Sequence, residues 1–211
     1  MENPKMVGSG LVECKPQVGK CENDCNQCYY NRNEEYKSVV ILPKDTGKIV
    51  RMNAGHDSNI RRGLVLAAAT RYEHVFFNTS IPRFDFPGPV VFTANSEEEL
   101  AASLIDIPEN LMFVRLRVSS TNLDFINEAI RYYTGKLVPV VLTYMAYYTA
   151  RPYNPGSYTW KKRFVNSYWC PTEVFKRNVL LEYGNRLVRN CGTLCKDCGN
   201  CETFYRLMKC G

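Results

Sequence analysis

The stretch Met112–Tyr144, MFVRLRVSSTNLDFINEAIRYYTGKLVPVVLTY, contains a complete strand–helix–strand pattern. Residues 112–118 and 138–144 are short apolar runs rich in the β-branched residues that strands favour. Between them, apolar side chains recur at the spacing of one helix face, at Leu123, Ile126, Ile130 and Tyr133. A helix that joins two such strands predicts a parallel βαβ unit.

The same alternation extends back along the chain. Three further apolar runs predict strands at residues 48–53, 74–77 and 89–93, and a helix is expected at residues 58–71. Residues 81–87 are too short and too rich in proline for a helix, so this connection departs from the regular pattern. Strands that alternate with helices predict an α/β fold, in which ligands bind at the carboxyl ends of the strands.

Capping residues predict where several helices begin. Ser96 and Glu99 fit a capping box, and Thr121 with Asp124 is expected to cap the helix after residue 120. A last helix is expected at residues 171–183, because proline suits the first helical position. Residues 151–163 are expected to form a long ordered loop.

The 211 residues include ten cysteines, and most of these fall into two tight clusters. Clustered cysteines in a chain of this size indicate metal or iron–sulfur ligands, and a secreted disulfide scaffold is the less favoured alternative. The first ten residues lack the apolar core of a secretory signal, and no stretch approaches the roughly 20 apolar residues of a membrane span. We therefore expect a soluble cytoplasmic protein with no membrane partner.

The first cluster consists of Cys21, Cys25 and Cys28, spaced C-x3-C-x2-C and followed by Tyr29. Three thiolates can hold three irons of a cubane cluster and leave the fourth iron open to a ligand. Zinc is the alternative, but a structural zinc site requires a fourth ligand. The nearest histidine in the sequence that could supply it is His56.

This motif, early in a chain that continues as β/α units, resembles the cluster motif of the radical S-adenosylmethionine (radical SAM) superfamily. The resemblance covers roughly residues 7–150, and we take 1–150 as the catalytic core. It implies a partial (β/α)6 TIM-like barrel and a [4Fe-4S] cluster on Cys21, Cys25 and Cys28. It also implies one-electron cleavage of S-adenosylmethionine, with an external electron donor, to a 5′-deoxyadenosyl radical that abstracts hydrogen from a substrate. The sequence identifies neither that substrate nor a catalytic acid or base.

The resemblance places cofactor-binding residues near the ends of the predicted strands. Gly55, His56 and Asp57 match the Gly-Gly-Glu-like turn that holds the methionine amine, although His56 stands where the family more often has glycine. Alternatively, Asp57 simply caps the helix at residues 58–71. The remaining candidates match later strands of the family: Thr93, Asn95, Arg115, Arg117, Ser119, Thr143 and Met145.

Strand alternation puts Arg115, Arg117 and Ser119 on one face of their strand. Two arginines inside a barrel need an anion such as the methionine carboxylate, whereas on the outside they are ordinary solvated charges. Both interpretations stay open at this point. Thr143 and Met145 could equally contact adenine or belong to the core.

The last part of the chain, residues 151–211, forms a basic and aromatic region with the second cysteine cluster. Cys191, Cys195, Cys198 and Cys201 are closely spaced, which favours an iron–sulfur cluster over zinc. Cys170 or Cys210 could replace one of them. Many radical SAM proteins carry a cysteine-rich C-terminal extension, which this region resembles, but its cysteine spacing matches no specific extension pattern. We expect this second metal site to have a structural role, with electron transfer or substrate ligation as the alternative.

Charge is distributed unevenly between these two parts. Residues 1–150 carry 16 basic and 17 acidic side chains, whereas residues 151–211 carry 11 and 4. Basic residues there are interleaved with aromatic ones: Tyr153, Tyr158, Trp160, Tyr168 and Trp169. This combination suits a nucleic acid or a peptide, or merely a solvated face, and no nucleic-acid-binding motif accompanies it.

Three functions therefore compete. The leading one is a radical SAM enzyme of unidentified substrate. The second is a non-catalytic, zinc-stapled module that binds nucleic acid or protein. The third is an electron carrier with two clusters, which needs neither a barrel nor a cluster with an open iron.

Overall fold

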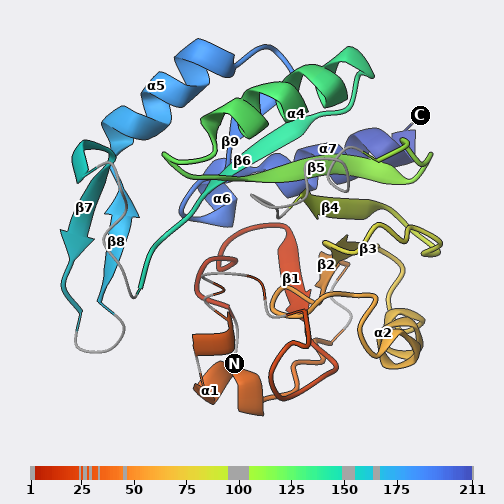
Figure 1. Ribbon diagram of the computed structural model, residues 1–211. Helices are drawn as coiled ribbons and strands as arrows, with labels where there is room; N and C mark the ends of the chain where they lie inside the picture. The colour runs from red at the N-terminus through yellow and green to blue at the C-terminus, as the bar shows by residue number, and fades with distance from the viewer. Residues whose placement is uncertain are drawn as a thin grey trace. The chain divides into compact units, whose positions relative to one another are not determined.

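The computed structural model describes residues 3–23, 25, 28, 30–32, 34–44, 47–94, 105–148, 155–163 and 167–210 (Figure 1). The chain divides into two compact units that interleave in sequence. The first unit comprises Met1–Thr93, Ile107–Phe113 and Gly192–Gly211, and the second comprises Ala94–Asp106 and Val114–Cys191. The expected division at residue 150 stays a prediction.

In the described part of the chain, seven strands follow the order β1-β2-β3-β4-β5-β6-β9. Their bounds are Leu11–Cys14, Ile49–Met52, Val75–Thr79, Val90–Ala94, Leu111–Val118, Val140–Tyr144 and Val188–Asn190. Within the first unit β1 to β4 pair in parallel, and within the second unit β5, β6 and β9 do so. This confirms the α/β class. Closure of the sheet into a partial barrel stays a prediction.

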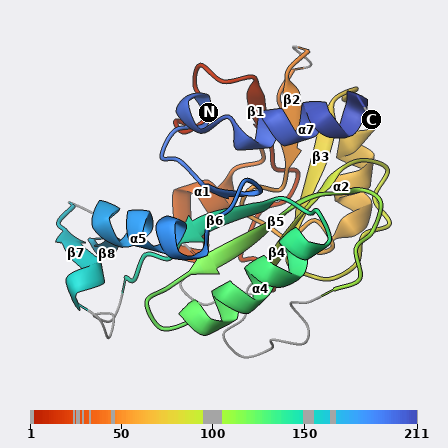
Figure 2. The same cartoon turned by 90° about the horizontal axis from the view of Figure 1, so that it is seen from above.

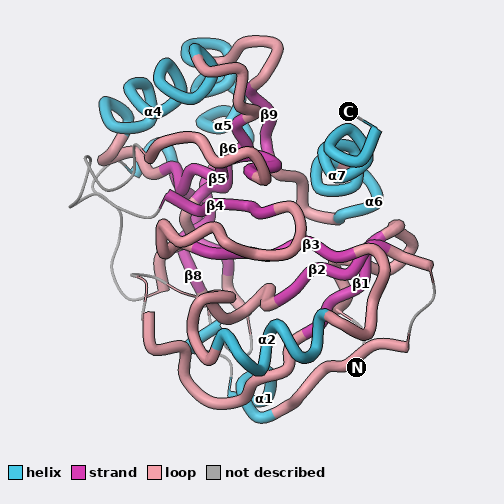
Figure 3. Tube along the Cα trace, turned by 90° about the vertical axis from the view of Figure 1, so that its right-hand side faces the viewer, coloured by secondary structure: helices cyan, strands magenta, loops and turns pink. Residues whose placement is uncertain are grey.

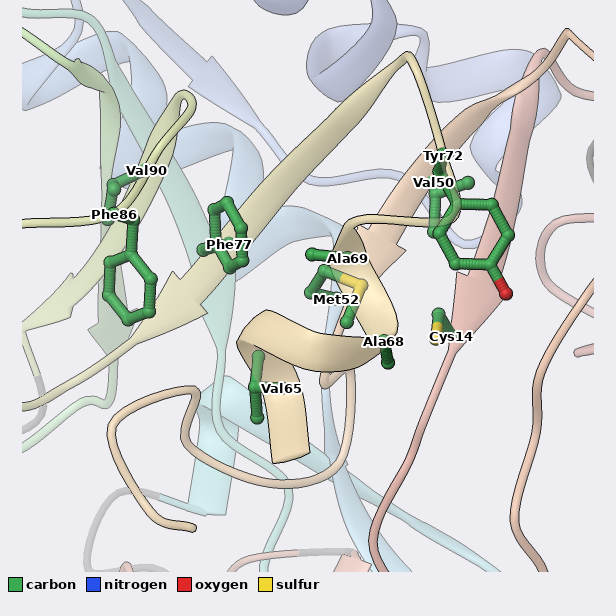
Figure 4. Close-up of a cluster of buried hydrophobic side chains, with 10 residues drawn as sticks. All are labelled: Cys14, Val50, Met52, Val65, Ala68, Ala69, Tyr72, Phe77, Phe86 and Val90. Atoms are coloured by element: carbon green, nitrogen blue, oxygen red, sulfur yellow. The ribbon is translucent and has the colours of Figure 1, made fainter. Parts of the chain in front are cut away.

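In the first unit, helix α2 (Arg62–Ala69) covers one face of the strands. Val65, Ala68 and Ala69 pack there against side chains of β1 to β4, as Figure 4 shows. Helix α7 (Asn200–Cys210) lies on the opposite face of β1 to β3 (Figure 3). It is held by Phe204 against Phe113 and by Tyr205 against Phe76, with ring centroids 5.4 and 6.4 Å apart.

In the second unit, helices α4 (Leu123–Gly135) and α5 (Glu173–Tyr183) lie on the same face of β5, β6 and β9 (Figure 2). Of the four apolar residues that predicted α4, Ile126, Ile130 and Tyr133 are buried, and Leu123 is the first residue of the helix. Tyr144 of β6 fixes α5, because its hydroxyl donates to the carbonyl of Lys176 at 3.0 Å and its ring packs on Phe175. The sequence thus predicted this layer correctly.

Several helix starts differ from expectation. α2 begins at Arg62 because residues 58–61 form turns, and Arg61 adopts a positive φ of 48°. Asn122, not Thr121, precedes α4, and its side chain binds back to the end of β5. α5 begins at Glu173, since Pro171 ends strand β8 and the hydroxyl of Thr172 accepts the first N–H bond of the helix. The helix expected from Ser96 lies outside the described residues.

The sequence patterns missed short elements that depend on pairing partners. These are β1, η1 (Tyr30–Arg32), α1 (Glu34–Ser38), η2 (Pro155–Ser157), β7 (Tyr158–Lys161), β8 (Tyr168–Pro171), β9, α6 (Cys195–Cys198) and α7. The expected loop at 151–163 was therefore wrong in part, because β7 pairs with β8 over all four of its residues. None of the described helices combines the length and apolar character needed to cross a membrane.

Candidate functional site

The first cysteine cluster lies in the loop that directly follows β1 in the first unit. The sequence did not predict β1, so it placed this loop before the first strand, whereas β1 ends at Cys14 and the loop continues from there. Because β1, β2 and β3 are parallel, the loop starts at their carboxyl edge. That edge is where ligands bind in parallel α/β folds.

Backbone and amide groups surround the thiols of the loop. The Cys21 thiol is buried and accepts hydrogen bonds from the backbone of Asp57 and Asn23. Burial raises the pKa of this thiol, and the nearby Asp57 and Cys28 add to the rise. Asn23 donates to the Cys25 sulfur at 3.3 Å, and the Cys28 N–H donates to the Cys25 carbonyl at 3.1 Å.

All cysteines whose side chains are described are free thiols. Across the described ranges, no three His, Cys, Asp or Glu side chains come together as a group that could hold a metal ion. The chemistry of the donor set nevertheless fits a cluster, because thiolates that accept N–H bonds are the usual ligands of iron–sulfur centres.

Tyr30, two residues after Cys28, occupies the space beside Gly55. A Cβ on Gly55 would stand 2.2 Å from Cδ2 of Tyr30 and 2.5 Å from its Cε2. The ring is buried and fixed, since its hydroxyl lies 3.2 Å from the carbonyl of Gly19 and 2.7 Å from Nε2 of His56. The missing side chain of Gly55 therefore makes room for this tyrosine.

The turn after β2 contains buried polar atoms that have no hydrogen-bond partner within the described ranges. His56 is only 6% exposed, and among the described atoms its Nδ1 has no hydrogen-bond partner. The same holds, within the described residues, for Oδ1 of Asn53 and Oγ of Ser58. Such orphaned groups are rare in folded proteins and each calls for a ligand or solvent partner.

The tautomer of His56 decides whether its Nδ1 accepts a hydrogen bond. Burial lowers the pKa of His56, and the nearby Lys15 lowers it further, so the ring is neutral at pH 7. When the Tyr30 hydroxyl donates to Gly19, Nε2 of His56 must carry the ring proton. Nδ1 then presents a lone pair, as Oδ1 of Asn53 does. Each of these two atoms can therefore accept an N–H bond.

Asp57 is already occupied by protein donors. Its Oδ1 accepts from the Asn59 N–H at 2.9 Å and from the Thr79 hydroxyl at 2.8 Å. Its Oδ2 accepts from the backbone N–H and the hydroxyl of Ser80. Four donors use the roughly four acceptor positions of a carboxylate. The Asp57 side chain therefore ties the turn before α2 to the end of β3. The expectation that it caps the helix was wrong, because α2 begins after Arg61, whose side chain makes no capping bond either.

Two buried charges beside the loop were not anticipated. Lys15 is 0% exposed, and its ammonium donates to the carbonyls of Gln17, at 3.1 Å, and Val39. It also lies over the rings of Tyr30 and Tyr36, 5.7 and 5.2 Å from their centroids. Burial lowers the pKa of Lys15, and Glu13, which is buried and bonded to the Tyr36 hydroxyl, opposes this effect. Nothing in the local sequence marks Lys15 as buried.

In the second unit, Arg115 and Arg117 are half-buried on one face of β5. They are level with Val141 and Thr143 of β6, and Arg189 of β9 is level with Val141. This is the face opposite α4 and α5, because Tyr144, which packs on α5, alternates to the other side. Both interpretations of the arginines stay predictions.

The remaining cofactor-binding candidates are buried or half-buried where the structure describes them. Ser119 is buried and its hydroxyl bonds to those of Thr121, at 2.9 Å, and Tyr147, at 2.6 Å. Met145 is buried, whereas Oγ1 of Thr143 is buried without a partner among the described atoms. Thr93 is half-buried at the end of β4 in the first unit, and Asn95 lies outside the described residues.

The second cysteine cluster is split between the two units. Cys195, Cys198 and Cys201 belong to the first unit, on α6 and at the start of α7, and are half-buried. Burial raises the pKa of the Cys195 thiol. The nearby Arg51 lowers this pKa, whereas Cys201 and Cys198 raise it further. Cys191 is exposed and belongs to the second unit, as does Cys170, and the Cys210 side chain is outside the described atoms.

Comparison of the chain with models of known protein families, with curated proteins and with solved structures finds no match.

Proposed function

We propose that the chain is a radical SAM enzyme with a partial (β/α)6 barrel fold. One observation carries the proposal: the three-cysteine loop follows the first strand of a parallel sheet. It starts at the same edge as a turn whose buried acceptors have no partner among the described residues. The strand order supports the fold, because it follows the chain without the reversal that marks doubly wound sheets.

The proposed cluster ligands are Cys21, Cys25 and Cys28, and the proposed amine acceptors are Asn53 and His56. When bound, the cluster supplies the electron that cleaves S-adenosylmethionine to a 5′-deoxyadenosyl radical, which takes hydrogen from a substrate still to be identified. The chain's own contribution is to bury Cys21, to hold the turn through Tyr30 and to keep His56 neutral.

For the C-terminal segment 192–211, here called the tail, we propose that Cys195, Cys198 and Cys201 hold a second iron–sulfur cluster or a zinc ion with a structural role. Three thiols on α6 and the first turn of α7 would then fix α7 against the strands of the first unit. An external reductant would serve the first cluster.

The test is anaerobic reconstitution with iron and sulfide, followed by dithionite and S-adenosylmethionine. We expect a brown protein that releases 5′-deoxyadenosine, measured by liquid chromatography with mass spectrometry. Cys25→Ala should abolish this product and keep the tail's metal, whereas the matched control Cys170→Ala, in β8 of the second unit, should keep full cleavage.

Cleavage that survives Cys25→Ala would contradict the ligand assignment. A colourless protein with stoichiometric zinc after anaerobic purification would instead favour the zinc-stapled binding module. A brown protein that never cleaves S-adenosylmethionine would favour the electron carrier.

A further inference from the structure

The β7–β8 hairpin of the second unit exposes an aromatic pair. The two strands run antiparallel (Figure 1). Trp160 is paired with Trp169, and their ring centroids lie 5.3 Å apart with the ring planes at 56°. Trp160 is 48% exposed, which is unusual for the largest apolar side chain. The Trp160 side chain is thus accessible to a ligand.

The base of the hairpin is firmly anchored to its unit. Tyr158 is buried, and its ring packs on Tyr147 and Phe175 with centroids 5.5 and 5.9 Å away. Tyr147 and Trp169 exchange backbone hydrogen bonds of 3.1 and 2.8 Å. An isolated two-stranded hairpin is marginal in water, so these contacts hold the exposed end in a defined position.

Positive charge is concentrated beside Trp160. Lys161, Lys162 and Arg163 follow it directly and are exposed, and Arg163 lies over the Tyr168 ring at 4.9 Å. The sequence has no Asp or Glu anywhere from residue 129 to residue 172. Where the structure is described, none of these three cations takes part in a salt bridge. The hairpin therefore presents uncompensated charge to a polyanion.

We propose that this hairpin binds single-stranded nucleic acid, with a base stacked on Trp160 and phosphates on Lys161, Lys162 and Arg163. Stacking rings beside a basic strand are what single-stranded nucleic acids require, since every base has an open π-face. An acidic peptide would use the cations and leave the tryptophan pair without a role. A duplex would hide its bases from the ring. The inference does not depend on the proposed cofactor chemistry.

The test measures fluorescence anisotropy of fluorescein-labelled 20-nucleotide oligouridine and oligothymidine with the full chain. Poly-glutamate of equal charge serves as the polyanion without bases. Binding at 50 mM NaCl should weaken roughly 20-fold at 200 mM if three phosphates are neutralised. Trp160→Ala should weaken it roughly 10-fold. The double variant Lys161→Gln/Lys162→Gln should reduce the slope of log affinity against log salt by about 1.4.

Two matched controls lie outside the hairpin in the same unit. Arg131→Gln removes one exposed charge from α4, and Leu181→Ala removes one exposed apolar side chain from α5, and both should bind as the native chain does. Absence of binding at 50 mM NaCl, equal affinity for poly-glutamate, or unchanged binding by Trp160→Ala would each overturn the proposal. Preference between the two oligonucleotides would tell RNA from DNA. Because the assay needs no cluster, its outcome is separate from that of the cleavage assay.

Discussion

Gly55→Ala is the most direct test of how the cysteine loop is held to the turn after β2. The added methyl would stand 2.2 and 2.5 Å from two carbons of the Tyr30 ring and 3.0 Å from Cε1 of Tyr36. The Tyr30 ring cannot swing aside freely, because it is 1% exposed and its hydroxyl is hydrogen-bonded to Gly19 and His56. Tyr30 must therefore shift as a whole and strain or break those bonds.

The expected cost follows from two contributions. Overpacking of a buried site costs about 1–3 kcal/mol. Each strained hydrogen bond of Tyr30 adds about 0.5–1.5 kcal/mol. We expect a total of about 3 kcal/mol in the free energy of unfolding, which lowers the Tm of a chain of this length by roughly 6–12 °C.

The assay is thermal and denaturant unfolding, followed by circular dichroism, with a double-mutant cycle. In a Tyr30→Ala background the steric clash is gone, so Gly55→Ala should cost less than about 1 kcal/mol. Gly63→Ala, in α2, is the matched control, because no described atom lies within 4 Å of its added methyl. That change should be neutral or stabilise by about 0.5–1 kcal/mol. Native-like stability of Gly55→Ala, or an equal cost with and without Tyr30, would refute the reasoning.

Two further predictions concern the same turn. Asp57→Asn should lower the free energy of unfolding by about 2–3 kcal/mol, because the amide cannot accept the four donors from Asn59, Thr79 and Ser80; a native Tm in calorimetry would disprove this. His56 has a pKa below 6.5 in the folded state, so the unfolded chain takes up this proton first as the pH falls below 6.5 and stability decreases. His56→Gln should flatten that decrease between pH 7 and 5, measured by denaturant unfolding at each pH; an unchanged slope would argue against it.

The second unit shows which structure the sequence could predict. Its helix α4 and strands β5 and β6 are long, periodic and bounded by turns, so local patterns were enough to predict them within one to three residues. The sequence did not predict β1 or the β7–β8 hairpin, because strands of four residues show little periodicity. Such strands are stabilised mainly by the strands they pair with. For the candidate site, the cysteine spacing singled out the loop, but Lys15 and Tyr30 were recognisable only from their contacts.

The sequence by itself determined the α/β class, the layer of α4 over its strands and the identity of the clustered thiols, because periodicity and spacing are local properties. Only the tertiary structure decided that Gly55 accommodates Tyr30 and that Asp57 is surrounded by protein donors. It also decided that His56 and Asn53 keep atoms without a partner in the described part of the chain. Burial and hydrogen-bond partners arise between residues distant in the chain. Their consequences for charge and packing therefore cannot be derived from neighbouring residues.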